Sequence, residues 1–191
     1  MAGVEEILGF WFGKPGEAGY GKPRKVWFVR DAAFDLEVRL RFLGDCEWAA
    51  AGKLEDWQST PAGCLALAIL LDQFPRNMFR GQPQAFATDS QALAVAHHAV
   101  AQGFDRQMLP VQRWFIYLPF EHSENVEHQR RSVELFRRLS DDPDSAPTID
   151  YAVRHQQIIE RFGRFPHRNQ ILGRETTPEE AEFLKQPGSS F

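Results

Sequence analysis

The segment Thr60–Leu71, TPAGCLALAILL, decides the fold class of this chain. Thr60 supplies a capping hydroxyl, and Pro61 takes the first helical position, where its missing N–H costs nothing. The residues that follow are apolar on every side, which is typical of a helix buried at the centre of a protein. The pattern therefore predicts a central buried helix that begins at Pro61 and ends before Pro75.

Helix signals recur on both sides of this segment, and no run alternates as a strand would. Residues 29–43, VRDAAFDLEVRLRFL, have the 3.6-residue period of an amphipathic helix. Thr88 and Gln91 form a capping-box pattern before an Ala-rich helix. The apolar run 111–120 is broken at Pro119, and a helical stripe then resumes toward Leu139, so the pair predicts a helical hairpin.

The C-terminal third continues the pattern. Thr148–Phe162 reads as a helix, and Thr177 with Glu180 supplies a capping box for a last short helix. We therefore predict an all-α fold in which residues 1–191 form a single domain of about seven or eight helices. The breakers and small residues of 186–191 predict a flexible tail that becomes ordered only if Phe191 docks.

Composition excludes several functional classes. The formal net charge of -4 and the pI of about 5.9 argue against a broad nucleic-acid surface, so nucleic acid is not expected as a partner. The longest apolar run falls short of the roughly 20 residues of a membrane span, so no membrane association is expected. Cys46 and Cys64 have neither disulfide-framework nor zinc spacing, which favours a cytoplasmic protein with no metal or cofactor.

Polar residues gather in three segments that local structure does not require. These segments are DQFPRN (72–77), FEHSENVEH (120–128) and RFGRFPHRN (161–169). Asp72 ends the most apolar helix, so it needs a partner such as Arg76 or a C-terminal arginine. The alternatives are an ion pair that fixes the corner and a pocket lined by Arg76 and Asn77.

The histidines carry the second set of expectations. Glu124 and His128 are one helical turn apart, which suits a metal, proton transfer or an ordinary helix start. His155 lies on an apolar helical face, which favours a histidine in the interior. His167 is flanked by arginines that lower its pKa and favour a neutral imidazole, so it is the leading candidate for a general base.

A family resemblance rests on three stretches: LLDQFPRNMFRG, YLPFEHSENVEHQRRSVELF and RFGRFPHRNQILGRETTPEEAEFL. Together they cover roughly a third of the chain, and the chain resembles the bacterial domain-of-unknown-function family 924. The resemblance implies a tetratricopeptide-like α-superhelix. It implies no activity, so it assigns no catalytic residue.

The leading hypothesis is a helical-array protein that binds a small anionic metabolite where the three segments meet. A second hypothesis is an enzyme with His167 or His122 as base and Glu121 as acid or orienting group. A third is a scaffold for a protein or peptide partner, which an exposed aromatic N-terminal segment would support, and a fourth is a purely structural network. The predicted ligand-binding residues are Asp72, Arg76, Asn77, Glu121, His122, Glu124, His128, His155, Arg164, His167, Arg168 and Asn169.

Overall fold

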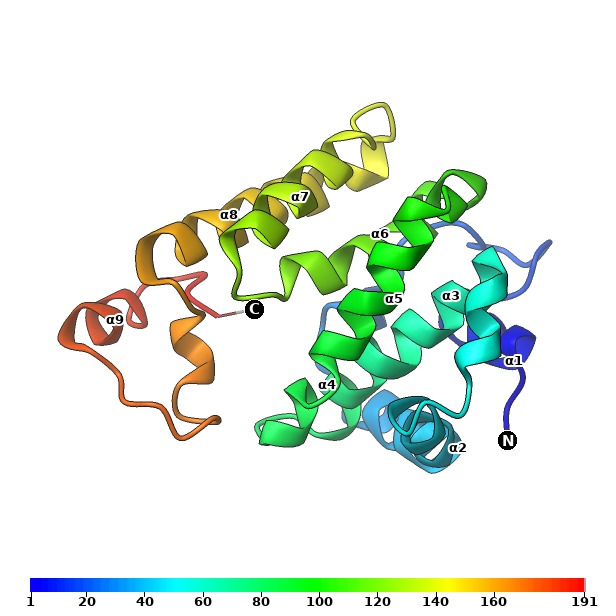
Figure 1. Cartoon of the computed structure of the whole chain (residues 1–191), viewed down its shortest axis with the longest axis horizontal. Coiled ribbons are helices and arrows are strands. Elements are labelled where there is room, and N and C mark those ends of the chain that lie inside the picture. Colours follow the sequence, from blue (N-terminus) through cyan, green and yellow to red (C-terminus); the bar gives the residue numbers. More distant parts are fainter. Residues whose placement is uncertain (191) are drawn as a thin grey trace.

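The computed structural model describes residues 1–190, which form helices joined by turns with no β-strand among them (Figure 1). The α-helices are α1 (Val4–Phe12), α2 (Ala32–Ala50), α3 (Pro61–Ala68), α4 (Phe74–Met78), α5 (Asp89–Ala101), α6 (Pro110–Glu121), α7 (Val126–Arg137), α8 (Ala146–Phe162) and α9 (Pro178–Phe183). Shorter 3₁₀ turns are η1 (Lys25–Trp27), η2 (Glu55–Ser59), η4 (Pro83–Phe86), η5 (Phe104–Gln107), η6 (Pro143–Ser145) and η7 (Pro166–Arg168). A π-helical segment, η3 (Ile69–Gln73), joins α3 to α4.

The predicted all-α class is confirmed. If α3, η3 and α4 are counted as one continuous helix, residues 1–190 contain eight helices, within the predicted number. The tetratricopeptide-like superhelix and the flexible tail stay predictions, and Phe191 lies outside the described residues. No helix in residues 1–190 has the length and apolar character needed to cross a membrane.

The central helix does not end where the sequence predicts. Thr60 caps its start as expected, but the helix runs through Pro75 by way of the π-helical segment η3, in which the Phe74 N–H bonds to the Ile69 carbonyl. In an α-helix Pro75 would leave the carbonyl four residues earlier, that of Leu71, without a donor. The Thr88 hydroxyl donates to that carbonyl, which allows the helix to continue.

Two further local predictions are wrong for related reasons. Because the Thr88 hydroxyl is engaged with the central helix, it makes no capping bond at the start of α5, and the Gln91 amide donates to the Ala50 carbonyl instead. Pro119 does not break the 111–120 run, because it lies inside α6, two residues before that helix ends at Glu121.

Glycines follow two of the helices. Gly103 and Gly163 adopt the left-handed conformation just beyond α5 and α8, with φ of 69° at both. Thr177 and Glu180 form the predicted capping box of α9.

The main core surrounds α3, which is flanked by α1, α5 and α6 (Figure 1). Aromatic side chains fill much of it, and Trp11 packs its ring edge-on against Phe74 and Phe115. Trp27 is also buried, whereas Phe28 is 59% exposed, so the aromatic N-terminal segments serve mainly the core.

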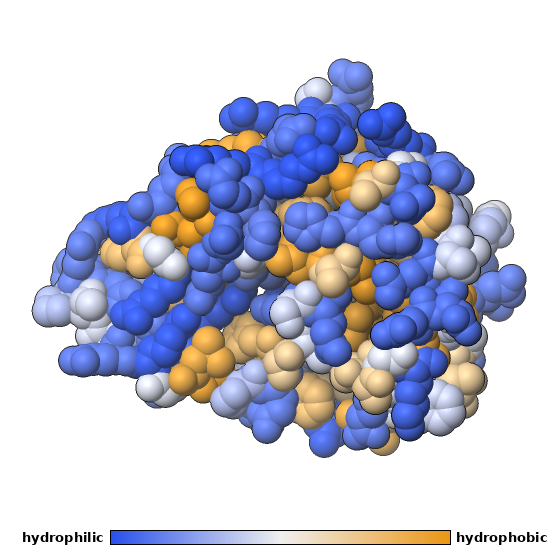
Figure 2. All heavy atoms as spheres, viewed as in Figure 1, coloured by the Kyte–Doolittle hydropathy of each residue, from blue (hydrophilic) through white to orange (hydrophobic). Residues whose placement is uncertain are grey.

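A second, smaller core lies at the C-terminal end. Ile158, Ile159 and Phe165 form it, with Phe162 and Phe183 packed alongside. Helices α7 and α8 lie side by side and connect this end to the rest of the molecule (Figure 1). In the same view the space-filling surface is hollowed where the C-terminal segments meet the main body (Figure 2).

Candidate functional site

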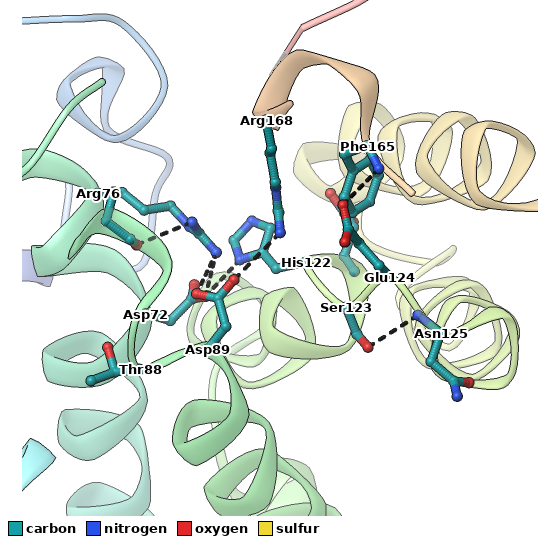
Figure 3. A network of polar contacts seen from close by, with 12 residues as sticks. Asp72, Arg76, Thr88, Asp89, His122, Ser123, Glu124, Asn125, Phe165 and Arg168 are labelled. Carbon is teal, nitrogen blue, oxygen red and sulfur yellow. Dashed lines mark hydrogen bonds and ion pairs between the residues drawn. The ribbon is translucent and has the colours of Figure 1, made fainter. Parts of the chain in front are cut away.

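Side chains from all three predicted segments meet between the two cores (Figure 3). Asp72 contacts His122, and Arg168 reaches across from the C-terminal segment to Asp89 at the start of α5. Arg76 bonds to both carboxylates and joins the two contacts into one network. Asp72, Arg76, Asp89, His122 and Arg168 are called the polar cluster below.

Asp72 is the fully buried centre of the cluster. The π-helical segment η3 places it one turn before Arg76, whose Nη2 lies 3.2 Å from Asp72 Oδ1. His122 Nδ1 lies 2.6 Å from the same oxygen, and the Gln73 side-chain amide donates to the other. Burial alone would raise the Asp72 pKa, but His122 and Arg76 outweigh it and hold the pKa well below its usual range. Asp72 is therefore a carboxylate at neutral pH.

His122 is oriented by that carboxylate. Burial and the Arg76 charge lower the His122 pKa below its ordinary value, although Asp72 opposes them. A neutral ring beside a carboxylate keeps its proton on Nδ1, and this N–H donates a hydrogen bond to Asp72. The lone pair on Nε2 is then left as an acceptor. No residue among 1–190 forms a hydrogen bond with Nε2. The pair has the geometry of a histidine base positioned by an acid.

Asp89 and Phe86 belong to the site although the sequence did not indicate them. Asp89 Oδ1 lies 2.9 Å from Arg76 Nη2, and burial raises the Asp89 pKa even though Arg76 opposes that rise. The Phe86 ring makes cation–π contacts with Arg76 and Arg168, whose guanidinium carbons lie 5.2 and 4.7 Å from the ring centroid. Asp89 reads in the sequence as a first-turn acid of α5, so only its position in space reveals its role.

Arg168 is the least satisfied charge of the cluster. It extends from η7, its side chain is 8% exposed, and its guanidinium stacks 4.5 Å from the Phe165 ring centroid. Its one ion contact within residues 1–190 is Nη1 to Asp89 Oδ2 at 3.5 Å, and its buried Nε has no hydrogen-bond partner there. Burial and the neighbouring Arg76 lower its pKa to about 10, so it remains a cation at neutral pH.

The cluster reaches the surface at one side. The side chains of Arg76, Asp89 and His122 are 20%, 21% and 14% exposed, whereas Asp72 is completely covered. In the view of Figure 3 the His122 ring appears between the ends of Arg76 and Arg168, with the Asp72 carboxylate below and to the left of it. The accessible part of the cluster therefore offers guanidinium donors and an imidazole acceptor, supported by a buried carboxylate.

Glu121 and His155 form a second buried pair next to the cluster. His155 Nδ1 donates a hydrogen bond to the Tyr151 carbonyl at 2.8 Å and lies 3.2 Å from Glu121 Oε1. Burial raises the Glu121 pKa to about 8 and lowers the His155 pKa to about 3. Both groups are therefore mostly neutral near pH 7. The Glu121 carboxyl group faces His155, and the acidic partner of His122 is Asp72.

Glu124 and His128 do not share one site. Glu124 lies before α7 begins, where it accepts from both Nη atoms of Arg174, at 2.7 and 3.0 Å, and from the Phe165 backbone N–H. His128 Nδ1 is 2.8 Å from the Ser123 hydroxyl. The expectation that the helical turn would align Glu124 with His128 is wrong, because α7 starts only at Val126.

The remaining predicted residues surround the cluster or lie apart from it. Arg164 holds Glu180 with two bonds, at 2.6 and 2.8 Å, and the buried Asn169 amide also donates to Glu180. Asn77 donates to Asp35 of α2. His167 is half-buried beside the Phe165 ring, and burial followed by the Arg168 charge lowers its pKa to about 4, in the predicted direction.

A metal centre is not built from the described side chains. Within residues 1–190, no group of three or more His, Cys, Asp or Glu side chains is arranged to hold a metal ion. The chemistry that the polar cluster can perform from its own groups is ion pairing, oxyanion binding and proton transfer at His122.

Comparisons with known proteins agree with the fold and leave the chemistry open. The family model described as a bacterial protein of unknown function (DUF924) matches residues 7–188. The chain is also similar to a solved structure of a protein of unknown function from Agrobacterium tumefaciens, with 40% sequence identity and a TM-score of 0.84. That match covers 95% of this chain and 96% of the other. No curated protein matches the sequence.

Proposed function

Since the chain belongs to the bacterial family DUF924, whose function is unknown, we propose a function from the polar cluster itself: the protein binds a small anionic metabolite between Arg76 and Arg168. The observation that carries this proposal is that Arg168 is buried with few of its hydrogen-bond donors satisfied. A guanidinium has five N–H donors in a fixed fork, yet this buried one has a single ion contact at 3.5 Å within residues 1–190. Buried donors without acceptors are costly, and an oxyanion would satisfy them.

Arg76 is the natural second anchor. It is held by Asp72 and Asp89, and it lies with Arg168 on the Phe86 ring, so the two cations are close together. Their mutual repulsion contributes to the lowered Arg168 pKa, and a bound anion would relieve it. The partly exposed edge of Arg76 gives a small ligand a path to both groups.

The test is a thermal-shift titration with phosphate and with di- and monocarboxylates. A ligand at a hundred times its Kd adds about 2.7 kcal/mol to the free energy of unfolding, which is a Tm rise of roughly 5–10 °C for a chain of this size. We expect one class to give such a rise, and we expect Arg168→Ala and Arg168→Gln each to remove it.

The control variant is Arg137→Ala. Arg137 is an exposed arginine at the end of α7 with no ion pair within residues 1–190, so its removal changes net charge equally without touching the cluster. A Tm rise that survives both Arg168 variants, or that Arg137→Ala also removes, would contradict this site.

Acid–base catalysis at His122 is a second candidate, and the 2.6 Å contact with Asp72 favours it. General-base groups contribute about 10²–10⁴-fold to a rate. If the bound anion is also a substrate, His122→Gln should lose turnover by that factor when measured at saturating ligand. A variant that keeps its full turnover would exclude His122 as the base.

A further inference from the structure

The charges of the polar cluster already balance without a ligand. Asp72 and Asp89 supply two carboxylates, and Arg76 and Arg168 supply two guanidiniums, while His122 is held in its neutral form. An added anion therefore finds hydrogen-bond donors but no net positive charge. Each extra negative charge on the ligand increases the cost of burying it.

The cluster also presents a hydrogen-bond acceptor, His122 Nε2, beside the two guanidinium groups. His122 Nδ1 is committed to Asp72, so the neutral ring presents a lone pair at Nε2, and no residue among 1–190 donates to it. In the view of Figure 3 this ring appears between the ends of Arg76 and Arg168, so a ligand held by both guanidiniums would face it. A ligand atom facing Nε2 is favoured if it is a donor, and it is repelled if it is another lone pair.

We infer that the site selects an oxyanion that retains an O–H, such as hydrogen phosphate, with its oxygens on Arg76 and Arg168 and its O–H donating to His122 Nε2. The inference rests on the proposed anion-binding function and specifies its ligand class. Fully deprotonated oxyanions of the same size are disfavoured, because they set a lone pair against Nε2. The selection works by one hydrogen bond and not by total charge.

The test compares three probes at pH 8.0 by isothermal titration calorimetry. Hydrogen phosphate and sulfate are both tetrahedral dianions at this pH, and they differ by one O–H. Methyl phosphate is also a dianion there, because its second pKa is near 6, and it keeps no proton. We expect phosphate to bind about 100-fold or more tightly than sulfate, with methyl phosphate resembling sulfate.

A variant locates the selecting atom. His122→Gln replaces the imidazole acceptor with an amide that can turn an N–H toward the ligand, so the ratio of phosphate to sulfate affinity should fall toward one. His97→Gln changes an exposed histidine of α5 that contacts Phe120 and His128 instead of the cluster, and it should keep the ratio. As a check that does not depend on a variant, ¹⁵N NMR of the native protein should show the His122 Nε2 signal moving when phosphate binds and the Nδ1 signal staying protonated.

The outcomes separate the two proposals. Equal binding of phosphate and sulfate, or a dicarboxylate bound in preference to phosphate, overturns the inference and leaves anion binding intact. Selection of phosphate that His122→Gln does not alter, with no ¹⁵N shift at Nε2, also overturns it. If no anion binds in either the titrations or the thermal-shift series, the proposed function itself fails.

Discussion

At the scale of single residues, the polar cluster depends on two adjacent side chains that point to different partners. Glu121 and His122 are neighbours at the end of α6, and consecutive helical residues point about 100° apart. One side chain therefore turns toward His155 and the other toward Asp72. Adjacent Glu and His residues suggest an interacting pair, but neighbouring side chains on a helix point in different directions. The predicted helix was therefore enough to argue against a Glu121–His122 pair.

Glu121 should make stability depend on pH in a predictable direction. Its folded-state pKa of about 8 is above the ordinary value, so between about pH 4.5 and 8 the folded state holds more protons than the unfolded state. Its contribution to the free energy of unfolding is then present at low pH and is lost as pH rises to 8. His155, with its lowered pKa, acts in the opposite sense between about pH 3 and 6.5.

A comparison with Glu121→Gln isolates this term, because Gln does not titrate and leaves the other groups in place. We expect the free energy of unfolding of the native protein, relative to the variant, to fall by up to a few kcal/mol between pH 5.5 and 8.5. Urea denaturation at both pH values measures it. An unchanged difference would mean that Glu121 is ionised throughout this range.

Asp72→Asn should remove both the charge and the orientation that the cluster depends on. Breaking a buried ion pair from one side costs roughly 3–5 kcal/mol. The partly exposed Asp144 pairs with Lys22 at the surface, and Asp144→Asn should cost less than about 1 kcal/mol. Denaturant midpoints give both values, and similar losses in the two variants would argue against a special role for Asp72.

At the scale of helices, the π-helical segment η3 carries the cluster. It lets the central helix pass Pro75 and places Asp72 and Gln73 at the junction of the two cores. The sequence predicted the helix and its capped start, because a hydroxyl, a proline and an apolar run are local signals. It could not predict the continuation, because the donor that replaces the missing N–H comes from Thr88, thirteen residues after Pro75.

Thr88→Val should therefore destabilise the protein by about 1–3 kcal/mol, the cost of a buried carbonyl without a donor. Thr88→Ser keeps the hydroxyl and should lose much less. Pro75→Ala restores a backbone N–H near the same carbonyl, so the cost of Thr88→Val should be smaller by at least about 0.5 kcal/mol in that background. Additive losses in the double-mutant cycle would show that the hydroxyl and the proline are energetically independent.

At the scale of the whole molecule, the two cores meet through polar side chains. The small core at the C-terminal end is supported by the Arg164–Glu180 and Arg174–Glu124 pairs, and Arg168 extends from it to the main body. The three sequence segments were correctly expected to converge. The sequence did not predict Asp89 and Phe86, the residues of the main body that Arg168 contacts. Asp89 begins a helix and Phe86 lies in a 3₁₀ turn, and neither stands out from its local sequence.

The division into a main core and a small C-terminal core predicts that backbone amides in the two cores exchange hydrogen at different rates. Amides of α9 and of the end of α8 should exchange through an opening of lower free energy than amides of α3, because fewer apolar groups cover them. Arg168→Ala should speed exchange in α9 and leave α3 unchanged, and hydrogen-exchange mass spectrometry resolves the two regions. A uniform increase across α3 and α9 would instead indicate one cooperative unit.

The five-residue turn at η3 can also be regarded as a single inserted residue within an otherwise regular helix. Deleting one residue between Ile69 and Leu71 would restore α-helical spacing, and because the π turn makes about one full rotation with one residue more than an α turn, the stretch after the deletion would keep its direction. Arg76 and Asn77 would stay near Asp89 and Asp35. A one-codon change in gene length at this place should thus leave the cluster assembled.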